Sequence, residues 1–237
     1  MPRFFVDTPL VQPGEFALPA GAARHVQVLR LQPGDALTLF DGSGPEWRAE
    51  VTAMGRSEVR VSLLAVEHPL RELARAVTLA VVMPANDRMD FLVEKATELG
   101  AAALQPLVSE RSVLRLAGER ADKKRAHWQG VAIAAAEQSG RTVPTRIEPV
   151  MTLAVWLAAL PEPADDEWRG LLSPRAAQPL AAFAQGRALF LSGPEGGLSD
   201  AEEDSARARG FAAISLGPRI LRADTAPLAV LSWLALS

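Results

Sequence analysis

The sequence predicts an α/β protein of two domains, a small β-barrel followed by a larger domain with a mainly parallel sheet. Residues 1 to about 70 contain short β-prone runs separated by closely spaced Gly and Pro. From Ala76 onward, apolar runs of strand length alternate with helical segments, which is the pattern of βαβ units. The length of 237 residues accommodates one large domain or two modest ones. We therefore expect domains at residues 1–70 and 71–237.

The first domain is expected to contain four strands and one helical turn. The strands are expected at residues 4–6, 36–40, 47–53 and 58–65, and the helical turn at residues 22–29. Short strands at this spacing are typical of a small barrel, which closes its own sheet edges. The polar stretch at residues 70–75 is expected to link the two domains.

The second domain is expected to alternate strands and helices. The strands are expected at residues 77–83, 102–107, 145–148, 169–173, 188–192 and 212–216. One helix follows Asn86, a suitable N-cap, and ends at Gly100. Another begins at Ser199, which forms a capping box with Glu202, and stops at Gly210. The last helix runs from about Thr225 to the end of the chain.

Composition excludes several classes of protein. The absence of Cys excludes disulfides, thiolate metal sites and cysteine nucleophiles. Only three histidines are present, far apart in sequence, so we expect no zinc or other metal site. The net charge of −3 argues against coating nucleic acid by bulk charge, although residues 111–125 carry six basic and two acidic side chains. With no signal-like or membrane-spanning apolar run, the expected location is cytoplasmic, without a membrane partner.

A segment rich in Gly and Pro follows the expected strand at residues 188–192. Its sequence, LSGPEGGLS, runs from Leu191 to Ser199. Three glycines before a helix N-terminus would let the backbone approach a ligand closely, and the free amides could receive an anion. A tight turn without a ligand is the alternative. The segment lacks the Lys-Ser/Thr ending of a P-loop, which argues against a nucleoside triphosphatase.

A second segment, LGPRILRADTA, runs from Leu216 to Ala226 after the expected strand at residues 212–216. It places Ile220 and Leu221 between two arginines, before an Asp-Thr helix start. Apolar side chains flanked by donors suit an aromatic base with a polar tail. Taken alone, the segment would be explained better by an ordinary strand-to-helix connection with exposed arginines.

Together with other motifs, these segments closely resemble the RsmE family of ribosomal RNA methyltransferases. The other motifs are MPRFF at residues 1–5, HVQVLR at 25–30, NDRMD at 86–90, KATELG at 95–100, SERS at 109–112 and AAEQSGR at 135–141. The resemblance covers nearly the whole chain. It implies a PUA-like β-barrel at residues 1–70 and a SPOUT domain with a C-terminal trefoil knot at residues 71–237. It also implies a homodimer that binds S-adenosylmethionine in the knot and methylates N3 of a uridine in 16S ribosomal RNA.

The resemblance also implies which residues surround the methyl donor. The expected cofactor-binding residues are Leu172, Ser173, Leu191, Gly193, Gly196, Gly197, Leu216, Gly217, Pro218, Ile220, Leu221 and Ala226. Uracil N3 must lose its proton, so Arg222 is expected to stabilise the charge that develops on a uracil oxygen. Glu195 and Asp224 are the acidic candidates for accepting the proton, although either could instead cap a helix or pair with an arginine. Asp224 stands where family members commonly have Glu.

Ribosomal RNA requires contacts to phosphates and bases. The expected RNA-binding residues are Arg3, Arg24, His25 and Arg30 in the first domain and Arg111, Arg115 and Arg141 in the second. For each arginine a surface ion pair is the alternative, and His25 could instead be a structural residue of the barrel. The final helix, apolar on more than one face, is expected to contribute to the knot core and the dimer interface.

Two other functions compete with this interpretation. A Rossmann-type methyltransferase would need a glycine-rich turn after the first strand of the second domain, but residues 84–87 are PAND. A non-catalytic RNA-binding or ribosome-assembly factor would keep the fold without turnover. The intact glycines of both segments disfavour that second alternative without excluding it.

Overall fold

The computed structural model describes residues 1–56, 58–84, 88–175, 178–180 and 186–236. The chain forms two compact units. The first comprises Met1–Glu72 and Ala136–Pro144, and the second comprises Leu73–Ala135 and Thr145–Ser237. The domain boundary expected from the sequence, between residues 70 and 71, does not account for residues 136–144, which belong with the N-terminal unit. The helical pattern of the sequence runs through residue 136 without a break, so local signals carry no mark of this change.

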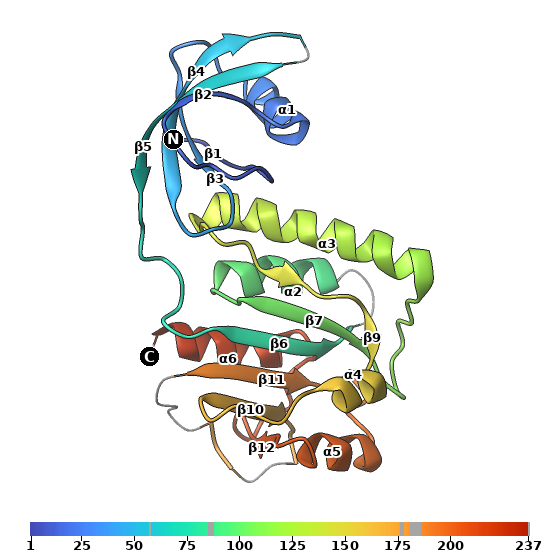
Figure 1. Cartoon of the computed structure of the whole chain (residues 1–237). Helices are drawn as coiled ribbons and strands as arrows, with labels where there is room; N and C mark the ends of the chain where they lie inside the picture. The colour runs from blue at the N-terminus through green and yellow to red at the C-terminus, as the bar shows by residue number, and fades with distance from the viewer. Residues whose placement is uncertain (57, 85–87, 176–177, 181–185, 237) are drawn as a thin grey trace. The chain divides into compact units, whose positions relative to one another are not determined.

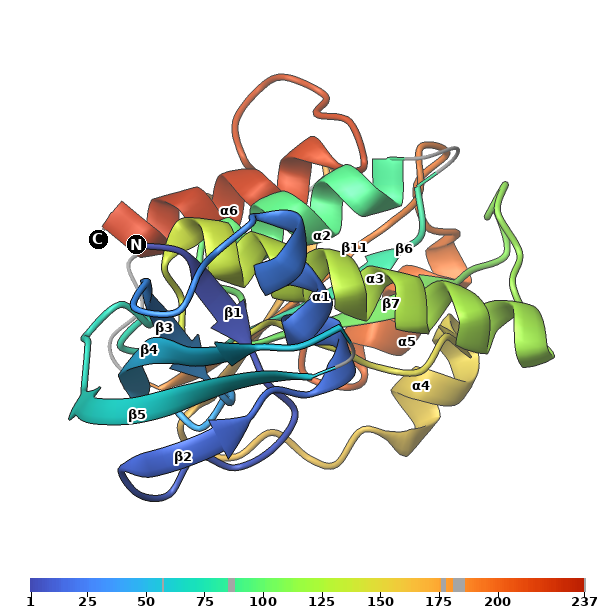
Figure 2. The same cartoon turned by 90° about the horizontal axis from the view of Figure 1, so that it is seen from above.

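The first unit is a mixed five-stranded sheet with one helix. Its elements are β1 (Arg3–Phe5), β2 (Gly14–Ala17), α1 (Ala20–Val28), β3 (Ala36–Phe40), β4 (Glu46–Met54) and β5 (Val59–Glu67). The strand order is β1-β3-β4-β5-β2, with β4 and β5 forming a long antiparallel pair (Figure 2). The sequence did not predict β2, because its four residues contain only one strongly β-prone side chain, Phe16.

Alternating side chains build the core of this unit. Val59, Val61 and Leu63 of β5 are buried together with Ala22 and Val26 of α1. Among the described residues the ladder ends at β1 and β2, so the expected closure into a barrel is not seen in the hydrogen-bond pattern. The four strands and the helix that the sequence predicted are all present, with ends shifted by a few residues.

The second unit contains a parallel sheet in the order β12-β10-β11-β6-β7-β8, with β9 also paired to β7 (Figure 1). The strands are β6 (Val77–Val82), β7 (Ala103–Val108), β8 (Arg146–Ile147), β9 (Met151–Thr152), β10 (Glu167–Leu172), β11 (Arg187–Ser192) and β12 (Ala212–Ile214). Every strand expected in this domain is present. The two-residue strand β9 was not expected, because so short a run carries no periodicity.

Helices cover both faces of this sheet. One face packs against α2 (Arg88–Glu98), α3 (Gly118–Ser139) and α6 (Thr225–Leu236), with α2 lying beside α6 (Figure 2). The other face packs against α4 (Leu153–Ala159) and α5 (Asp200–Arg207). Leu79 and Val81 of β6 enter the first core, and Ala80 and Val82 enter the second. Burial on both faces explains why the strands read as continuous apolar runs.

The helix boundaries follow the local signals where these are described. Ser199 and Glu202 form the predicted capping box at the start of α5. Gly100 follows α2 with φ +95°, the left-handed conformation that commonly ends a helix. The expected N-cap of α2, Asn86, lies outside the described residues.

The strand order of this sheet changes direction next to β6. The chain first adds β7 and β8 on one side of β6, and then returns to the other side, where β11 lies between β6 and β10 and β12 lies beyond β10. Ligands of open parallel sheets bind at the carboxyl ends of strands where the strand order changes direction in this way. The knot implied by the resemblance stays a prediction. None of the described helices is long and apolar enough to cross a membrane.

Candidate functional site

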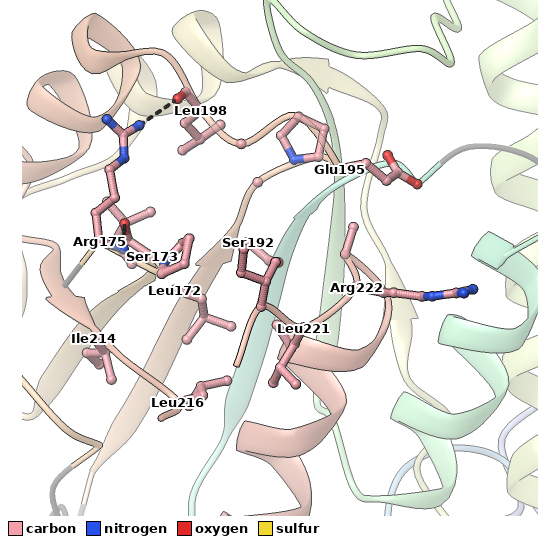
Figure 3. Close-up of a pocket in the computed structure, with 18 of the residues that line it drawn as sticks. Leu172, Ser173, Arg175, Ser192, Glu195, Leu198, Ile214, Leu216, Leu221 and Arg222 are labelled. Atoms are coloured by element: carbon pink, nitrogen blue, oxygen red, sulfur yellow. Dashed lines mark hydrogen bonds between the residues drawn. The ribbon is translucent and has the colours of Figure 1, made fainter. Parts of the chain in front are cut away.

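A cavity of about 440 Å³ lies at the carboxyl ends of β10, β11 and β12 (Figure 3). Three loops line it, at residues 171–175, 192–198 and 214–223, together with side chains of α5 and α6. Its volume falls within the range of about 300–1,000 Å³ that is usual for small-molecule sites. Both segments that the sequence singled out therefore meet at one pocket, with the end of β10 as a third wall.

The glycine loop, residues 193–198, requires glycine at two positions for different reasons. Gly197 has φ +67°, which an L side chain rarely adopts, and its N–H donates to the Pro194 carbonyl at 2.9 Å. A Cβ at Gly193 would lie 3.1 Å from Leu198 Cγ and 3.2 Å from the Leu198 nitrogen. The loop backbone thus turns tightly at Gly197 and packs closely against itself at Gly193.

Residues of one distant segment, 110–111, and of the helix that follows hold the glycine loop in place. Arg111 Nη1 donates to the carbonyls of Gly196 at 3.0 Å and Leu198 at 3.4 Å. Glu202 Oε1 accepts from the Glu110 N–H at 2.8 Å, while its Oε2 accepts from Ser199 N–H at 2.9 Å. Arg111, expected to contact RNA, therefore braces the glycine loop while the residue itself is exposed.

The floor of the cavity is apolar. Figure 3 shows Leu172, Ile214, Leu216 and Leu221 converging there from the ends of β10 and β12 and from the segment that precedes α6. Gly217 has φ +100° and its N–H donates to Ser215 Oγ at 3.2 Å, which turns the chain at the end of β12. A flat apolar group such as a purine fits such a floor.

One wall of the cavity is polar. Glu203 and Ser173 are both buried, and Ser173 Oγ donates to Glu203 Oε1 at 3.3 Å. Arg175 Nη2 lies 3.4 Å from the same carboxylate oxygen and also donates to the Leu198 carbonyl at 3.3 Å (Figure 3). The hydrogen bond from Arg175 to Asp200 and the charge of Arg175 hold the pKa of Asp200 below its ordinary value.

The sequence did not predict Arg175 or Glu203. Arg175 immediately follows Leu172-Ser173-Pro174, so extending that third wall by one residue would have included it. Glu203 shares the buried face of α5 with Ala206, and a carboxylate on the core-facing side of a helix is an unusual placement that marks a site.

The rim of the cavity carries the charged catalytic candidates. Figure 3 shows Glu195 and Arg222 on the same side of the pocket, away from Ser173 and Arg175. Arg88 Nη1 lies 3.9 Å from Glu195 Oε1. Asp224, the third candidate, does not line the cavity, and its buried Oδ1 has no hydrogen-bond partner among the described residues. The structure thus brings two of the three candidates to the pocket.

Ten of the twelve expected cofactor-binding residues line the cavity. They are Leu172, Ser173, Gly193, Gly196, Gly197, Leu216, Gly217, Ile220, Leu221 and Ala226. Leu191 does not, because its side chain enters the core between the sheet and helices α4 and α5, while the adjacent Ser192 lines the pocket. Pro218 also does not line the cavity and is exposed to solvent.

Two arginines that were expected to contact RNA form ion pairs inside the first unit. Arg141, with a side chain 4% exposed, donates through Nε to Glu72 Oε2 at 2.9 Å. Arg3 pairs with the buried Glu46 and donates to the carbonyls of Gly140 and Arg141, each at 3.1 Å. Because both guanidinium groups bind partners within the unit, the structure does not support a phosphate contact for either arginine.

The other expected RNA contacts are exposed. Arg24 and His25 lie on α1, and Arg30 follows its last turn with φ +57°. His25 Nδ1 is 4.0 Å from Glu137 Oε2, and its side chain is more than half exposed. Arg115, in the second unit, is exposed and donates to the Glu110 carbonyl at 2.8 Å.

Comparison with known proteins agrees with this architecture. Residues 71–235 match the RNA methyltransferase domain family, and residues 18–64 match the RNA methyltransferase PUA domain. The chain is 31% identical over 244 residues to ribosomal RNA small subunit methyltransferase E of Bacillus subtilis, covering 98% of this chain and 95% of that protein. The chain belongs to the RsmE family. Its predicted fold class, a PUA-like β domain followed by a parallel-sheet SPOUT-like domain, is confirmed.

Solved structures of similar proteins extend the comparison to the pocket. Ribosomal RNA small subunit methyltransferase E from Neisseria gonorrhoeae, bound to S-adenosyl methionine, superposes with a TM-score of 0.91 at 35% identity, covering 100% of this chain and 97% of that chain. A structure from Legionella pneumophila with the bound cofactor SAM gives a TM-score of 0.90 at 31% identity, covering 99% of this chain and 96% of that chain. Two solved structures with this fold therefore hold the same methyl donor.

Proposed function

We propose that this RsmE-family chain binds S-adenosylmethionine in the cavity and methylates N3 of a uridine in 16S ribosomal RNA. The observation that carries the proposal is the cavity itself, built from the glycine loop and the segment at residues 214–223 in a fold whose relatives hold the donor. We further propose that the chain acts in the cytoplasm as a homodimer, because the resemblance implies a dimer and ribosomal RNA is its substrate.

The lining of the cavity fits this donor. Gly193, Gly196 and Gly197 all line the cavity, so backbone of the glycine loop is available to a bound molecule. The apolar floor suits adenine, and the wall at Ser173 and Glu203 suits a polar portion of the molecule. When bound, S-adenosylmethionine supplies an electrophilic methyl group. The ten lining residues expected from the sequence are proposed to hold it, joined by Ser192.

The charged rim is proposed to handle the acceptor base. Uracil N3 carries a proton at neutral pH, and this proton must leave for the nitrogen to act as a nucleophile. Arg222 is proposed to stabilise the negative charge that develops on a uracil oxygen. Glu195 is the better-placed proton acceptor, because it lines the cavity and Asp224 does not. The ion pair between Glu195 and Arg88 supports a positioning role as the alternative.

RNA contacts are proposed for the exposed basic residues of both units. Arg24, His25 and Arg30 lie at or beside α1, and Arg115 follows the segment that braces the glycine loop. These side chains remain available for phosphates or splayed bases.

Two measurements test the proposed function. Calorimetry of the purified chain with S-adenosylmethionine should show binding at one site per chain. Nucleoside mass spectrometry of 16S ribosomal RNA, treated with the chain and the donor, should show N3-methyluridine. Absence of donor binding would overturn the proposal. Donor and RNA binding without a methylated nucleoside would instead favour the non-catalytic assembly factor, and methylation of another atom would overturn the N3 assignment.

A further inference from the structure

The polar wall of the cavity contains a carboxylate, Glu203, that pairs with two arginines and also lines the cavity. Glu203 lines the cavity and is buried. Its Oε2 pairs with Arg207 Nη2 at 2.7 Å, but Arg207 also pairs with the exposed Asp204 through Nη1 at 2.7 Å. Surface pairing of Arg207 therefore does not require a second, buried carboxylate. Pairing with Arg207 and Arg175 offsets much of the cost of burying the charge of Glu203. Its place on the cavity wall also lets this carboxylate bind a polar group of a ligand.

The hydrogen-bonding capacity of Glu203 leaves room for that partner. An ionised carboxylate has about four acceptor positions. The described donors are Ser173 Oγ at 3.3 Å, Arg175 Nη2 at 3.4 Å and Arg207 Nη2 at 2.7 Å. Among the described contacts, at least one acceptor position of Glu203 therefore remains.

The mixture of groups at this wall selects the chemistry of the partner. Glu203 accepts, whereas Arg175 and Ser173 can donate, so a group that both donates and accepts matches the wall best. A ribose hydroxyl does both. An ammonium group only donates and would be repelled by the Arg175 cation beside Glu203. The edge of adenine also carries a donor beside acceptors, but its flat ring suits the apolar floor of Leu172, Ile214 and Leu216, which assigns the purine to that floor.

We propose that Glu203, supported by Ser173 and Arg175, accepts a hydrogen bond from a ribose hydroxyl of the methyl donor and is a specificity-determining residue of this chain. This inference rests on the proposed function, because it requires the donor in this cavity. The chemistry parallels that of dinucleotide-binding folds, in which an acidic residue accepts from a ribose hydroxyl. The carboxylate here comes from helix α5, immediately after the glycine loop.

The test compares nucleoside ligands by calorimetry and needs no catalytic turnover. The probes are S-adenosylhomocysteine, 5′-methylthioadenosine, which lacks the amino-acid portion, and the 2′-deoxy and 3′-deoxy forms of 5′-methylthioadenosine. The wild-type chain should bind at least one deoxy form about tenfold or more weakly than the parent, as expected for loss of a hydrogen bond to a charged group. Glu203→Met should bind parent and deoxy forms with nearly equal affinity.

Two further variants keep the result interpretable. Glu203→Gln retains the shape and one acceptor oxygen, so it should discriminate several-fold less than wild type even if Glu203→Met fails to fold. Asp204→Asn removes the exposed carboxylate next in sequence and should leave discrimination unchanged.

Each outcome has a distinct meaning. If the wild-type chain binds neither S-adenosylhomocysteine nor 5′-methylthioadenosine, the proposed function fails. If it binds them but binds the deoxy forms as tightly as the parent, only the role of Glu203 is overturned. The same holds if Glu203→Met and Glu203→Gln show the same difference in affinity between parent and deoxy forms as the wild type. The role is also overturned if Glu203 variants weaken S-adenosylhomocysteine but not 5′-methylthioadenosine, which would assign the carboxylate to the amino-acid portion.

Discussion

At the scale of single residues, the pocket depends on Arg111, whose guanidinium bonds two carbonyls of the glycine loop. Arg111→Ala should raise the KM for S-adenosylmethionine by about tenfold, because two hydrogen bonds that order the loop are lost. RNA affinity should change little. Steady-state kinetics and RNA titration measure the two effects. Arg120→Ala, which removes a nearby exposed charge, serves as the control, and a selective loss of RNA affinity in Arg111→Ala would return this residue to the RNA face.

Arg222 tests the assignment of the rim to the acceptor base. Arg222→Ala should lower kcat by about 10²-fold, the usual effect of removing one donor to a developing oxyanion, and change donor affinity much less. Kinetics together with calorimetry separate these quantities. Arg219→Ala removes an exposed arginine of the same segment and should have the smaller effect on kcat. Equal losses of kcat and donor affinity in Arg222→Ala would assign that residue to donor binding.

Residue types differ in how far the sequence identifies their roles. The glycine loop could be identified in advance from its three glycines, and the structure gives Gly197 a positive φ and places Gly193 close to the Leu198 backbone. Glu203 could not, because its neighbour Ser173 lies thirty positions away and the two meet only after β10 and α5 are packed. Side-chain partnership across such separations has no local signal.

At the scale of elements, Asp41 organises the turn between β3 and β4. Burial opposes its charged form, but hydrogen bonds from Ser43 Oγ at 2.6 Å, Leu10 N–H at 2.9 Å and Ser43 N–H at 3.0 Å outweigh this, so the pKa of Asp41 lies below the ordinary value for an aspartate. A lowered carboxyl pKa adds stability above the unfolded-state pKa, and that stability is lost as the pH falls through the folded-state pKa.

Asp41→Asn should therefore reduce the free energy of unfolding by about 1 kcal/mol near pH 7, because one acceptor oxygen replaces two. The difference from wild type should shrink as the pH falls below about 3.8. Urea unfolding between pH 3 and pH 7 measures both quantities, with Asp7→Asn, an exposed carboxyl change in the same unit, as the control. A difference that stays constant over this range would show that the charge of Asp41 contributes nothing.

Helices and strands were predicted correctly where local sequence signals are strong. They were missed where a strand forms only because another strand pairs with it. The capping box of Ser199 and Glu202 follows from residue type and spacing, and the structure shows it. Strand β2 exists because β5 offers a partner edge to Gly14–Ala17, not because those four residues favour a strand. Its formation is decided by a tertiary contact, so no window of the sequence around it predicts it.

At the scale of the whole molecule, the first unit has one exposed arginine, Arg30, in a left-handed backbone conformation. Arg30 has φ +57° where glycine is usual, and the N–H groups of Arg30 and Leu31 donate to Gln27 and Val26 carbonyls in a helix-ending motif. A left-handed arginine costs about 1 kcal/mol relative to glycine. An exposed, strained residue at a helix end is consistent with selection for binding over stability.

Arg30→Gly should accordingly raise the free energy of unfolding by up to about 1 kcal/mol while weakening RNA binding. The slope of log affinity against log salt should fall by about one, because one phosphate contact is lost. Binding of S-adenosylmethionine in the second unit should be unchanged. Arg60→Ala, on β5, provides the control for loss of an exposed arginine. Unchanged RNA affinity and salt slope in Arg30→Gly would remove Arg30 from the RNA face.

Local patterns along the chain were sufficient to predict the alternation of strands and helices and the two glycine-bearing segments, because glycine geometry, capping and apolar periodicity act over a few residues. The family was identified from the resemblance of several motifs, not from these patterns. The tertiary structure alone decided that Ser192 rather than Leu191 lines the cavity. It also decided that Arg3 and Arg141 form internal ion pairs and that residues 136–144 belong to the first unit. Burial and partnership are properties of groups that meet in space, such as Arg141 and Glu72, which lie 69 positions apart in the chain.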